Sequence, residues 1–480
     1  MFATSHGFGL IARLTAVAML LSAGVITREP VRAASLSPQA ALVRVFTVTP
    51  IQPAWFAPSF LAAISVAQVT QGIEGIKAQV GPYRSVTKRS DGSFLVRLKS
   101  GTASAQISLD TAGRITGLEI TNVQLTGPAS GTNGKSPGGV AARVAAIDAL
   151  LRQRTRDHAF SGVVLVAVHG KVMLSKGYGF ADAAHGVPNT VNTEFRIGSI
   201  SKQFAAVSIL QLQEAGKLSI HDYLCRYIQP CPKAWAPITL QMLLTHTSGL
   251  PTNLVVPGST ADDTKPITPK QGIDLIKQVA LDRAPGASYE YSNANFDLLG
   301  YIVEEVAGVP YASYLNSHIF GPLSLKRSGY DTSRIDAPTH AIGYSAWAVP
   351  APYIDLSWLY AAGALYSTVG DLQHWDHALV SDVLLSKAST KDMLAGHAVI
   401  CDNVATCGSY DKLAYGYGLV RGVLAGRTII WHNGKLNGFV AMNEMLPKQD
   451  ITIIVLSNLE SSGADGILGV ALAKMMLGLA

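Results

Sequence analysis

The segment from 203 to 215 is the feature that most restricts how this chain can fold. It is rich in helix-forming residues and almost entirely apolar, and Gly216, a natural helix end, follows it. A helix that is apolar on all sides is buried, so the pattern predicts a substantial core around it. Hydrophobic residues make up 48% of the 480 residues, which agrees with such a core and excludes a disordered chain.

Ser199 and Lys202 lie at the N-terminal end of this predicted helix, three residues apart and therefore on one face. A serine hydroxyl is a poor nucleophile at neutral pH and needs a base beside it. A desolvated lysine has a lowered pKa and can be that base, and a helix N-terminus favours developing negative charge. The S-x-x-K pattern recurs by chance in many chains, so a purely structural pair remains an alternative on this motif alone.

A second cluster of polar residues is Tyr291-Ser292-Asn293, which follows a turn-rich stretch and begins an apolar segment. A tyrosine near a lysine loses its proton more easily and can also act as the base for a serine. Asn293 can hydrogen-bond the lysine or a substrate amide. Considered alone, the cluster fits a packed tyrosine and a helix-capping asparagine equally well.

A third cluster is His432-Asn433-Gly434, at the end of a predicted strand and followed by Lys435. Gly434 would let a substrate approach the strand backbone closely. Backbone N–H groups at such a place can form half of an oxyanion hole. A lone His-x-Gly also fits an ordinary turn.

Residues 140–480 are expected to form one α/β domain. Strands near both ends, with a mostly helical and loop-rich middle, predict a sheet that joins the N- and C-terminal parts. The expected elements are a helix over 140–154, strands over 162–168, 171–177, 428–432, 438–446 and 451–457, and a helix over 466–479.

Residues 41–125 are expected to form a separate small α+β domain. Apolar residues recur with helical spacing over 55–64 and over 69–80, and three segments with alternating apolar residues then predict strands. Residues 126–139 have the composition of a flexible linker. The linker contains a G-x-S-x-G match at 134–138, which we reject as a nucleophile elbow because no strand precedes it and proline follows the serine.

Residues 1–33 have the pattern of a secretory signal, with a basic residue, an apolar run over 14–26 and small residues before a cleavage point. An uncleaved N-terminal anchor is the alternative. Cleavage would remove three arginines and one glutamate and leave a net charge of +4. No basic run suggests nucleic-acid binding, and no later stretch predicts a membrane span, so we expect an exported protein, periplasmic or secreted.

The four cysteines form two pairs, each six residues apart: Cys225 with Cys231 and Cys401 with Cys407. In the oxidising environment of an exported protein, two local disulfides are expected. Reduced, buried cysteines are the alternative. The spacing of the cysteines is not the one found in zinc sites.

The order of the three clusters resembles the serine β-lactamase and penicillin-binding protein family, closest to its class C branch, which includes esterases and D-amino-acid peptidases. That family has S-x-x-K, then Y-x-N, then a Lys- or His-x-Gly strand. The resemblance covers roughly residues 140–480 and extends to the stretches 243–251 and 362–368. It implies an α/β (α+β) fold in which helices flank an antiparallel sheet beside an all-helical subdomain. Residues 41–125 are similar to cystatin-like or ketosteroid-isomerase-like α+β domains.

The resemblance also implies roles for the clustered residues. Ser199 is acylated, Lys202 and Tyr291 move its proton, and which of the two is the base stays open. Asn293 positions Lys202 or the substrate. The third motif is expected to bind the substrate and its oxyanion through His432, Gly434 and Lys435.

One departure from the family pattern narrows the expected substrate. His432 stands where typical β-lactamases carry a lysine that helps to hold a β-lactam carboxylate, and histidine is mostly neutral near pH 7. We therefore expect a hydrolase of esters or of peptides with a D-residue, without metal or cofactor. A β-lactamase and a non-catalytic cell-wall or β-lactam sensor are the alternatives. The sequence predicts a small-molecule or peptide substrate and carries no signal for the oligomeric state.

Overall fold

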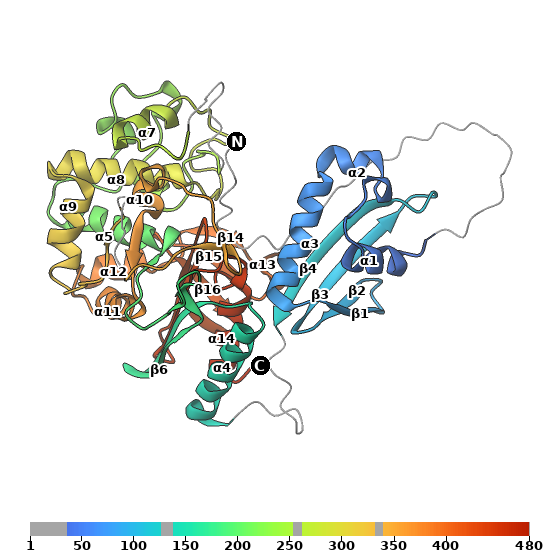
Figure 1. Cartoon of the computed structure of the whole chain (residues 1–480). Helices are drawn as coiled ribbons and strands as arrows, with labels where there is room; N and C mark the ends of the chain where they lie inside the picture. The colour runs from blue at the N-terminus through green and yellow to red at the C-terminus, as the bar shows by residue number, and fades with distance from the viewer. Residues whose placement is uncertain (1–35, 126–137, 253–261, 332–338, 480) are drawn as a thin grey trace. The chain divides into compact units, whose positions relative to one another are not determined.

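The computed structural model describes residues 36–125, 138–252, 262–331 and 339–479, which belong to two compact units (Figure 1). The smaller unit contains residues 36–125, and the larger contains the described residues from 138 to 476. The predicted signal segment and nearly all of the predicted linker lie outside the described residues. Among the described helices, none combines the length and the apolarity that a membrane span requires.

The smaller unit packs three helices against a four-stranded antiparallel sheet whose strands follow one another in the order β1-β2-β3-β4. Its core contains Phe46, Phe60, Val69 and Val96, each at most 1% exposed. The bounds are α1 Pro38–Thr47, α2 Pro58–Ala63, α3 Val66–Val80, β1 Tyr83–Lys88, β2 Phe94–Leu98, β3 Gly101–Leu109 and β4 Ile115–Leu125.

The structure corrects the sequence-based description of this unit in two ways. The helix expected over 55–64 is a short turn, Pro53–Trp55, followed by α2, because Pro58 can begin a helix but cannot continue one. Helix α1 and strand β1 were not predicted. The side chains of β1 are all exposed or half-buried, so it lacks the apolar alternation that identified its neighbours.

The larger unit is built on an eight-stranded antiparallel sheet in the order β14-β15-β16-β17-β18-β19-β5-β6. Strand β19 pairs with β5 along seven residues of each, so the sheet joins both ends of the domain as the sequence predicts. Its strands are β5 Gly162–Val168, β6 Lys171–Tyr178, β14 Ala398–Cys401, β15 Lys412–Tyr415, β16 Val420–Leu424, β17 Arg427–Leu436, β18 Phe439–Leu446 and β19 Ile451–Ser457.

Helices cover both faces of this sheet. Neighbouring residues of β18 identify the faces, because side chains alternate along a strand. Asn443 donates to Asp376 of α11 on one face, and Glu444 lies against Gly469 of α14 on the other. Helix α4 lies beside α14, since Arg143 donates to the carbonyl of Met476. The bounds are α4 Gly139–Arg156, α11 Val369–Val380 and α14 Ile467–Leu477.

The helical part of the larger unit surrounds α5 (Ser201–Glu214). Helices α8 and α10 contact α5 directly, and α7 packs on α8 (Figure 1). Helix α6 also packs on α8. This arrangement buries most of α5, including every residue from Ser201 to Leu210. The bounds are α6 Leu240–Leu244, α7 Pro269–Ile276, α8 Asn293–Ala307, α9 Tyr311–Leu315, α10 Tyr360–Gly363 and α12 Lys387–Met393.

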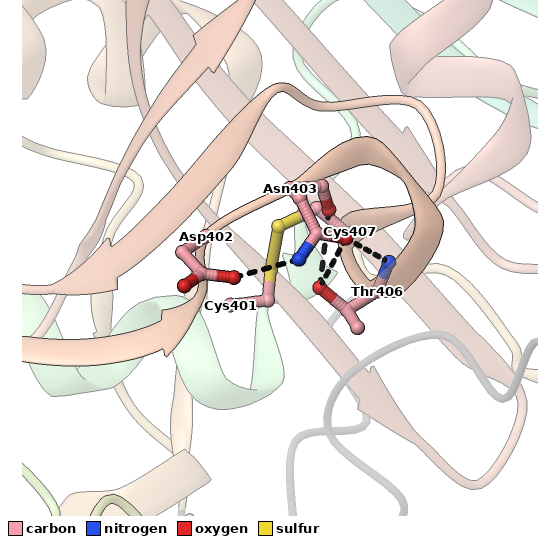
Figure 2. The surroundings of a disulfide bond; sticks show 5 residues. All are labelled: Cys401, Asp402, Asn403, Thr406 and Cys407. Atoms are coloured by element: carbon pink, nitrogen blue, oxygen red, sulfur yellow. Dashed lines mark hydrogen bonds between the residues drawn. A yellow bond between two sulfur atoms is a disulfide. The ribbon is translucent and has the colours of Figure 1, made fainter.

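Both predicted disulfides are confirmed. Cys225 and Cys231 are bonded in the loop after α5, and Cys401 at the end of β14 is bonded to Cys407 at the end of α13 (Val404–Cys407). Figure 2 shows the second bond and the short helix that it closes. Asn403 caps that helix by accepting from the backbone N–H of Thr406, so the disulfide and the cap hold the same turn.

Candidate functional site

Ser199 lies in a tight turn immediately before α5. The turn spans Gly198–Ile200 and is a single 3₁₀ turn rather than the first turn of the α-helix. Gly198 has a φ of 52°, a conformation that favours glycine, and a Cβ on it would lie 2.9 Å from the backbone nitrogen of Lys435. The turn therefore brings Ser199 against strand β17, which carries the third predicted cluster.

Lys202, the second residue of α5, is completely buried. Its Nζ lies 3.0 Å from Ser199 Oγ, 2.8 Å from Asn293 Oδ1 and 2.8 Å from the carbonyl oxygen of Ala362. Burial lowers the pKa of Lys202 from its ordinary value, and the negative charge of Asp297 opposes that shift. The structure thus brings the first and second clusters together around one buried amine.

The partners of Lys202 define what its neutral form can do. An amide oxygen and a backbone carbonyl can only accept hydrogen bonds, so Asn293 and Ala362 take both hydrogens of an uncharged amine. The nitrogen lone pair is then left for the third neighbour, the hydroxyl of Ser199. In this state Lys202 can accept the hydroxyl proton at the distance that general-base catalysis requires.

Tyr291 lies beside the same amine, just before α8. Lys202 Nζ is 4.9 Å from the centre of its ring, and the ring of His432 is 6.3 Å away. Burial raises the pKa of Tyr291 above its ordinary value, although a hydrogen bond with Ser199 acts in the opposite direction. A buried phenol of this kind stays protonated near neutral pH and can pass a proton only if it receives one in return.

Strand β17 has a free edge next to Ser199. Strand β16 pairs with β17 only as far as Trp431, so residues 432–436 pair with β18 alone among the described strands. A Cβ on Gly434 would overlap the carbonyl oxygen of Ile197 and lie 3.2 Å from the backbone nitrogen of Ser199. Glycine is therefore needed at this position, and its absent side chain lets the backbones of β17 and the Ser199 turn meet.

His432 is held as a neutral ring. Its Nδ1 lies 2.6 Å from the carbonyl of Asn433 and so carries the proton, and its Nε2 accepts from the hydroxyl of Tyr415 at 2.9 Å. Burial, together with the charge of Lys202, lowers the pKa of His432 to about 3. The side chain of Lys435 points elsewhere, with Nζ 3.6 Å from Glu460, so only its backbone faces the turn of Ser199.

The sequence-based reasoning missed Asp297 and Ala362 as neighbours of Lys202. The backbone N–H of Ala362 donates to Asp297 Oδ1 at 3.2 Å, while its carbonyl accepts from Lys202. Asp297 stands four residues after Asn293 in α8, so one helical turn presents both side chains to the same region. That spacing was the available signal. His246 also contributes, because its Nδ1 accepts from the backbone N–H of Ser292 and ties its loop to the start of α8.

Comparison with known proteins identifies the family. The sequence profile described as Beta-lactamase matches residues 147–473, more than half of the chain. The chain belongs to the beta-lactamase family. The matched range contains all three clusters and none of the smaller unit, so the family assignment concerns the larger unit alone.

Among the described residues, no group of three His, Cys, Asp or Glu side chains is placed to hold a metal ion.

Proteins of two bacteria are similar to this chain in sequence. PbpX of Bacillus subtilis (strain 168), named as a penicillin-binding protein, is 33% identical over 317 residues, which cover 65% of this chain and 74% of PbpX. Protein Flp of Staphylococcus aureus (strain MW2) is 27% identical over 64% of this chain, and the chain spans 61% of the length of Flp.

Two solved structures show the same fold. The octameric penicillin-binding protein homologue from Pyrococcus abyssi has a TM-score of 0.60 and 25% identity, covering 70% of this chain and 77% of its own. The D-stereospecific amidohydrolase from Streptomyces sp. has a TM-score of 0.58 and 24% identity, covering 70% of this chain and 99% of its own. The predicted β-lactamase/transpeptidase-like fold is confirmed by these similarities and by the observed antiparallel sheet flanked by helices.

Proposed function

We propose that this protein is an exported serine hydrolase that forms an acyl-enzyme on Ser199. The observation that carries the proposal is the set of partners around Lys202, which directs the lone pair of its neutral amine at the Ser199 hydroxyl. A lysine that is fully buried without another charge in hydrogen-bonding contact is costly to keep in a core, so its position favours a role in the reaction.

In the proposed first step, Ser199 Oγ attacks the substrate carbonyl carbon while Lys202 Nζ takes the hydroxyl proton. The backbone N–H groups of Ser199 and Lys435 donate to the oxygen that becomes negative; the close approach of the Ser199 turn to β17 at Gly198 and Gly434 supports this pairing. The proton then passes to the leaving group, with the neutral hydroxyl of Tyr291 as the relay. Lys202, rather than Tyr291, is the base, since burial opposes a phenolate.

In the proposed second step, water attacks the acyl carbonyl and gives its proton to the same amine. The bond between the acyl carbon and Ser199 Oγ then breaks, and Ser199 recovers its proton from Lys202. The carboxylic acid leaves, and the enzyme returns to its initial state without any cofactor. Asn293 keeps one hydrogen of the Lys202 amine engaged throughout, so the lone pair remains directed at the hydroxyl.

The proposed substrates are esters and amides or peptides with a D-residue. His432 supports this choice over β-lactams, because its Nε2 accepts from Tyr415 and its pKa is far below neutrality. A ring in that state offers no fixed positive charge to a β-lactam carboxylate. Export is proposed from the apolar N-terminal run in the sequence and from the two disulfides, which form in oxidising compartments.

The mechanism is tested by incubating the protein with a fluorescent fluorophosphonate and mapping the labelled residue by mass spectrometry. We expect a single label on Ser199 and none in Ser199→Ala. Labelling elsewhere, or labelling that persists in the variant, would contradict the proposal. The substrate class is tested separately by comparing kcat/KM for nitrophenyl esters, D-alanyl peptides and nitrocefin. Fast turnover of nitrocefin would overturn the interpretation of His432 while leaving the role of Ser199 intact.

A further inference from the structure

Asp297 is a buried carboxylate that the proposed reaction does not use. It lies in α8 and is 9% exposed, and burial raises its pKa well above the ordinary value, whereas the charge of Lys202 lowers it. A carboxylate in such surroundings is costly unless it is matched by a nearby positive charge. Asp297 accepts a hydrogen bond from the backbone N–H of Ala362 and interacts electrostatically with Lys202.

A single peptide segment connects this carboxylate with the base. Ala362 donates its N–H to Asp297 Oδ1 and offers its carbonyl to Lys202 Nζ, so the carboxylate fixes the residue whose oxygen orients the amine. Asn293, the other acceptor of the amine, stands one turn before Asp297 in the same helix. Both orienting contacts of Lys202 therefore depend on α8, one directly and one through Asp297.

We propose that Asp297 is a positioning residue for Lys202: it fixes the carbonyl of Ala362 in the orientation that directs the amine at Ser199, and it balances the charge of the amine when that amine holds a proton. The inference rests on the proposed function, because it assigns Asp297 a role in the same proton transfer. When Lys202 takes the proton of Ser199, the ammonium forms beside a carboxylate instead of in an uncharged core.

The other titratable groups around the pair are neutral near pH 7. Tyr291, Tyr311 and Tyr330 all respond to the charge of Asp297, and burial raises the pKa of each phenol. His246 and His432 respond to the charge of Lys202, and burial lowers the pKa of each ring. Among the described groups, Asp297 is thus the one charge that raises the pKa of Lys202.

Two substitutions separate the charge of Asp297 from its hydrogen bond. In Asp297→Asn the amide oxygen still accepts from Ala362, but the negative charge that raises the pKa of Lys202 is gone. The pKa of the amine then falls, so the acid limb of the kcat/KM profile for a nitrophenyl ester shifts to lower pH by about one unit. In Asp297→Ala the acceptor is also lost, and we expect kcat to fall by about tenfold with little change in KM.

Glu444→Gln is the matched control. Glu444 is 0% exposed, against 9% for Asp297, and burial raises its pKa to about 8, but it lies on the face of the sheet opposite His432. It should leave the pH profile unchanged. If Asp297→Asn fails to fold, Asp297→Ser removes the same charge in a smaller volume.

The outcomes distinguish the two proposals. An acid limb that coincides in wild type, Asp297→Asn and Glu444→Gln would overturn the role of Asp297 while Ser199→Ala remains inactive. Full activity in Ser199→Ala would instead overturn the proposed function itself. A limb that shifts in Glu444→Gln as much as in Asp297→Asn would show a general effect of buried charge and would also contradict the inference.

Discussion

The two units of this protein bury very different kinds of side chain. In the smaller unit, Ser93 is the one buried polar residue among those described, and the rest of the core is apolar. The larger unit buries Lys202, His246, Asp297 and His432 around the candidate site, and Glu444 on the far face of its sheet. Buried ionisable groups lower stability unless they are matched, so their concentration in one unit indicates where structure serves chemistry as well as folding.

The largest expected effect is on activity alone. Ser199→Ala removes the proposed nucleophile but only one oxygen atom from the larger unit. We expect kcat/KM for nitrophenyl esters to fall by a factor of about 10³ or more, with the thermal unfolding midpoint unchanged. Residual activity close to that of the wild type would show that the buried polar groups serve another purpose, and the contrast between the units would lose its functional meaning.

In the smaller unit we expect a substitution that lowers stability and leaves activity unchanged. Phe60 is completely buried and stacks on Phe56 with ring centres 5.0 Å apart. Phe60→Ala should cost the smaller unit about 3–5 kcal/mol of unfolding free energy, because it leaves a cavity in an apolar core. Denaturant unfolding followed by circular dichroism measures the loss, and ester hydrolysis at low denaturant is expected to stay at the wild-type rate. A parallel loss of activity would mean that the two units are energetically coupled.

Glu444 tests whether a buried charge lowers stability in the larger unit. Burial raises the pKa of Glu444 in the folded state to about 8, from an ordinary 4.5. Between these pH values the unfolded state has released the proton and the folded state still holds it, so the folded state loses stability as pH rises. Glu444→Gln removes that penalty. Its stability relative to wild type should therefore increase by about 5 kcal/mol from acidic to mildly alkaline pH, measured by urea unfolding. The exposed Asp402→Asn should show no such trend, and an equal trend there would refute the assignment.

The smallest expected effect concerns the disulfides, both of which lie in the larger unit. Replacing Cys225 and Cys231 by serine opens a short loop, and the loss in unfolding free energy should be about 2 kcal/mol. Thiol alkylation of the folded wild-type protein without reductant should label no cysteine. If all four cysteines were labelled, the bonds would be absent in solution and one support for export would be lost.

The sequence predicted the larger unit better than the smaller one, for physical reasons. Strands β5 and β19 are almost entirely buried and appear as nearly continuous apolar runs, whereas β1 carries exposed or half-buried side chains throughout. The clusters around Ser199, Tyr291 and His432 could be singled out because each breaks an apolar or turn pattern with reactive groups. Asp297 was missed despite its spacing from Asn293, since an aspartate on an amphipathic helix ordinarily faces water. Its meaning depends on Ala362, which only the fold brings near.

The pairing of β5 with β19 also affects the order in which parts of this domain fold. Gly162 pairs with Ser457 and Val168 with Ile451, so a strand near the start of this domain pairs with residues that are synthesised much later. Contacts between such distant parts of a chain form late and slowly, because a long loop must close first. Strand β17, which completes the surroundings of Ser199, belongs to the same late segment. The nucleophile helix is therefore one of the first parts of this domain to be synthesised and one of the last to acquire its reactive environment.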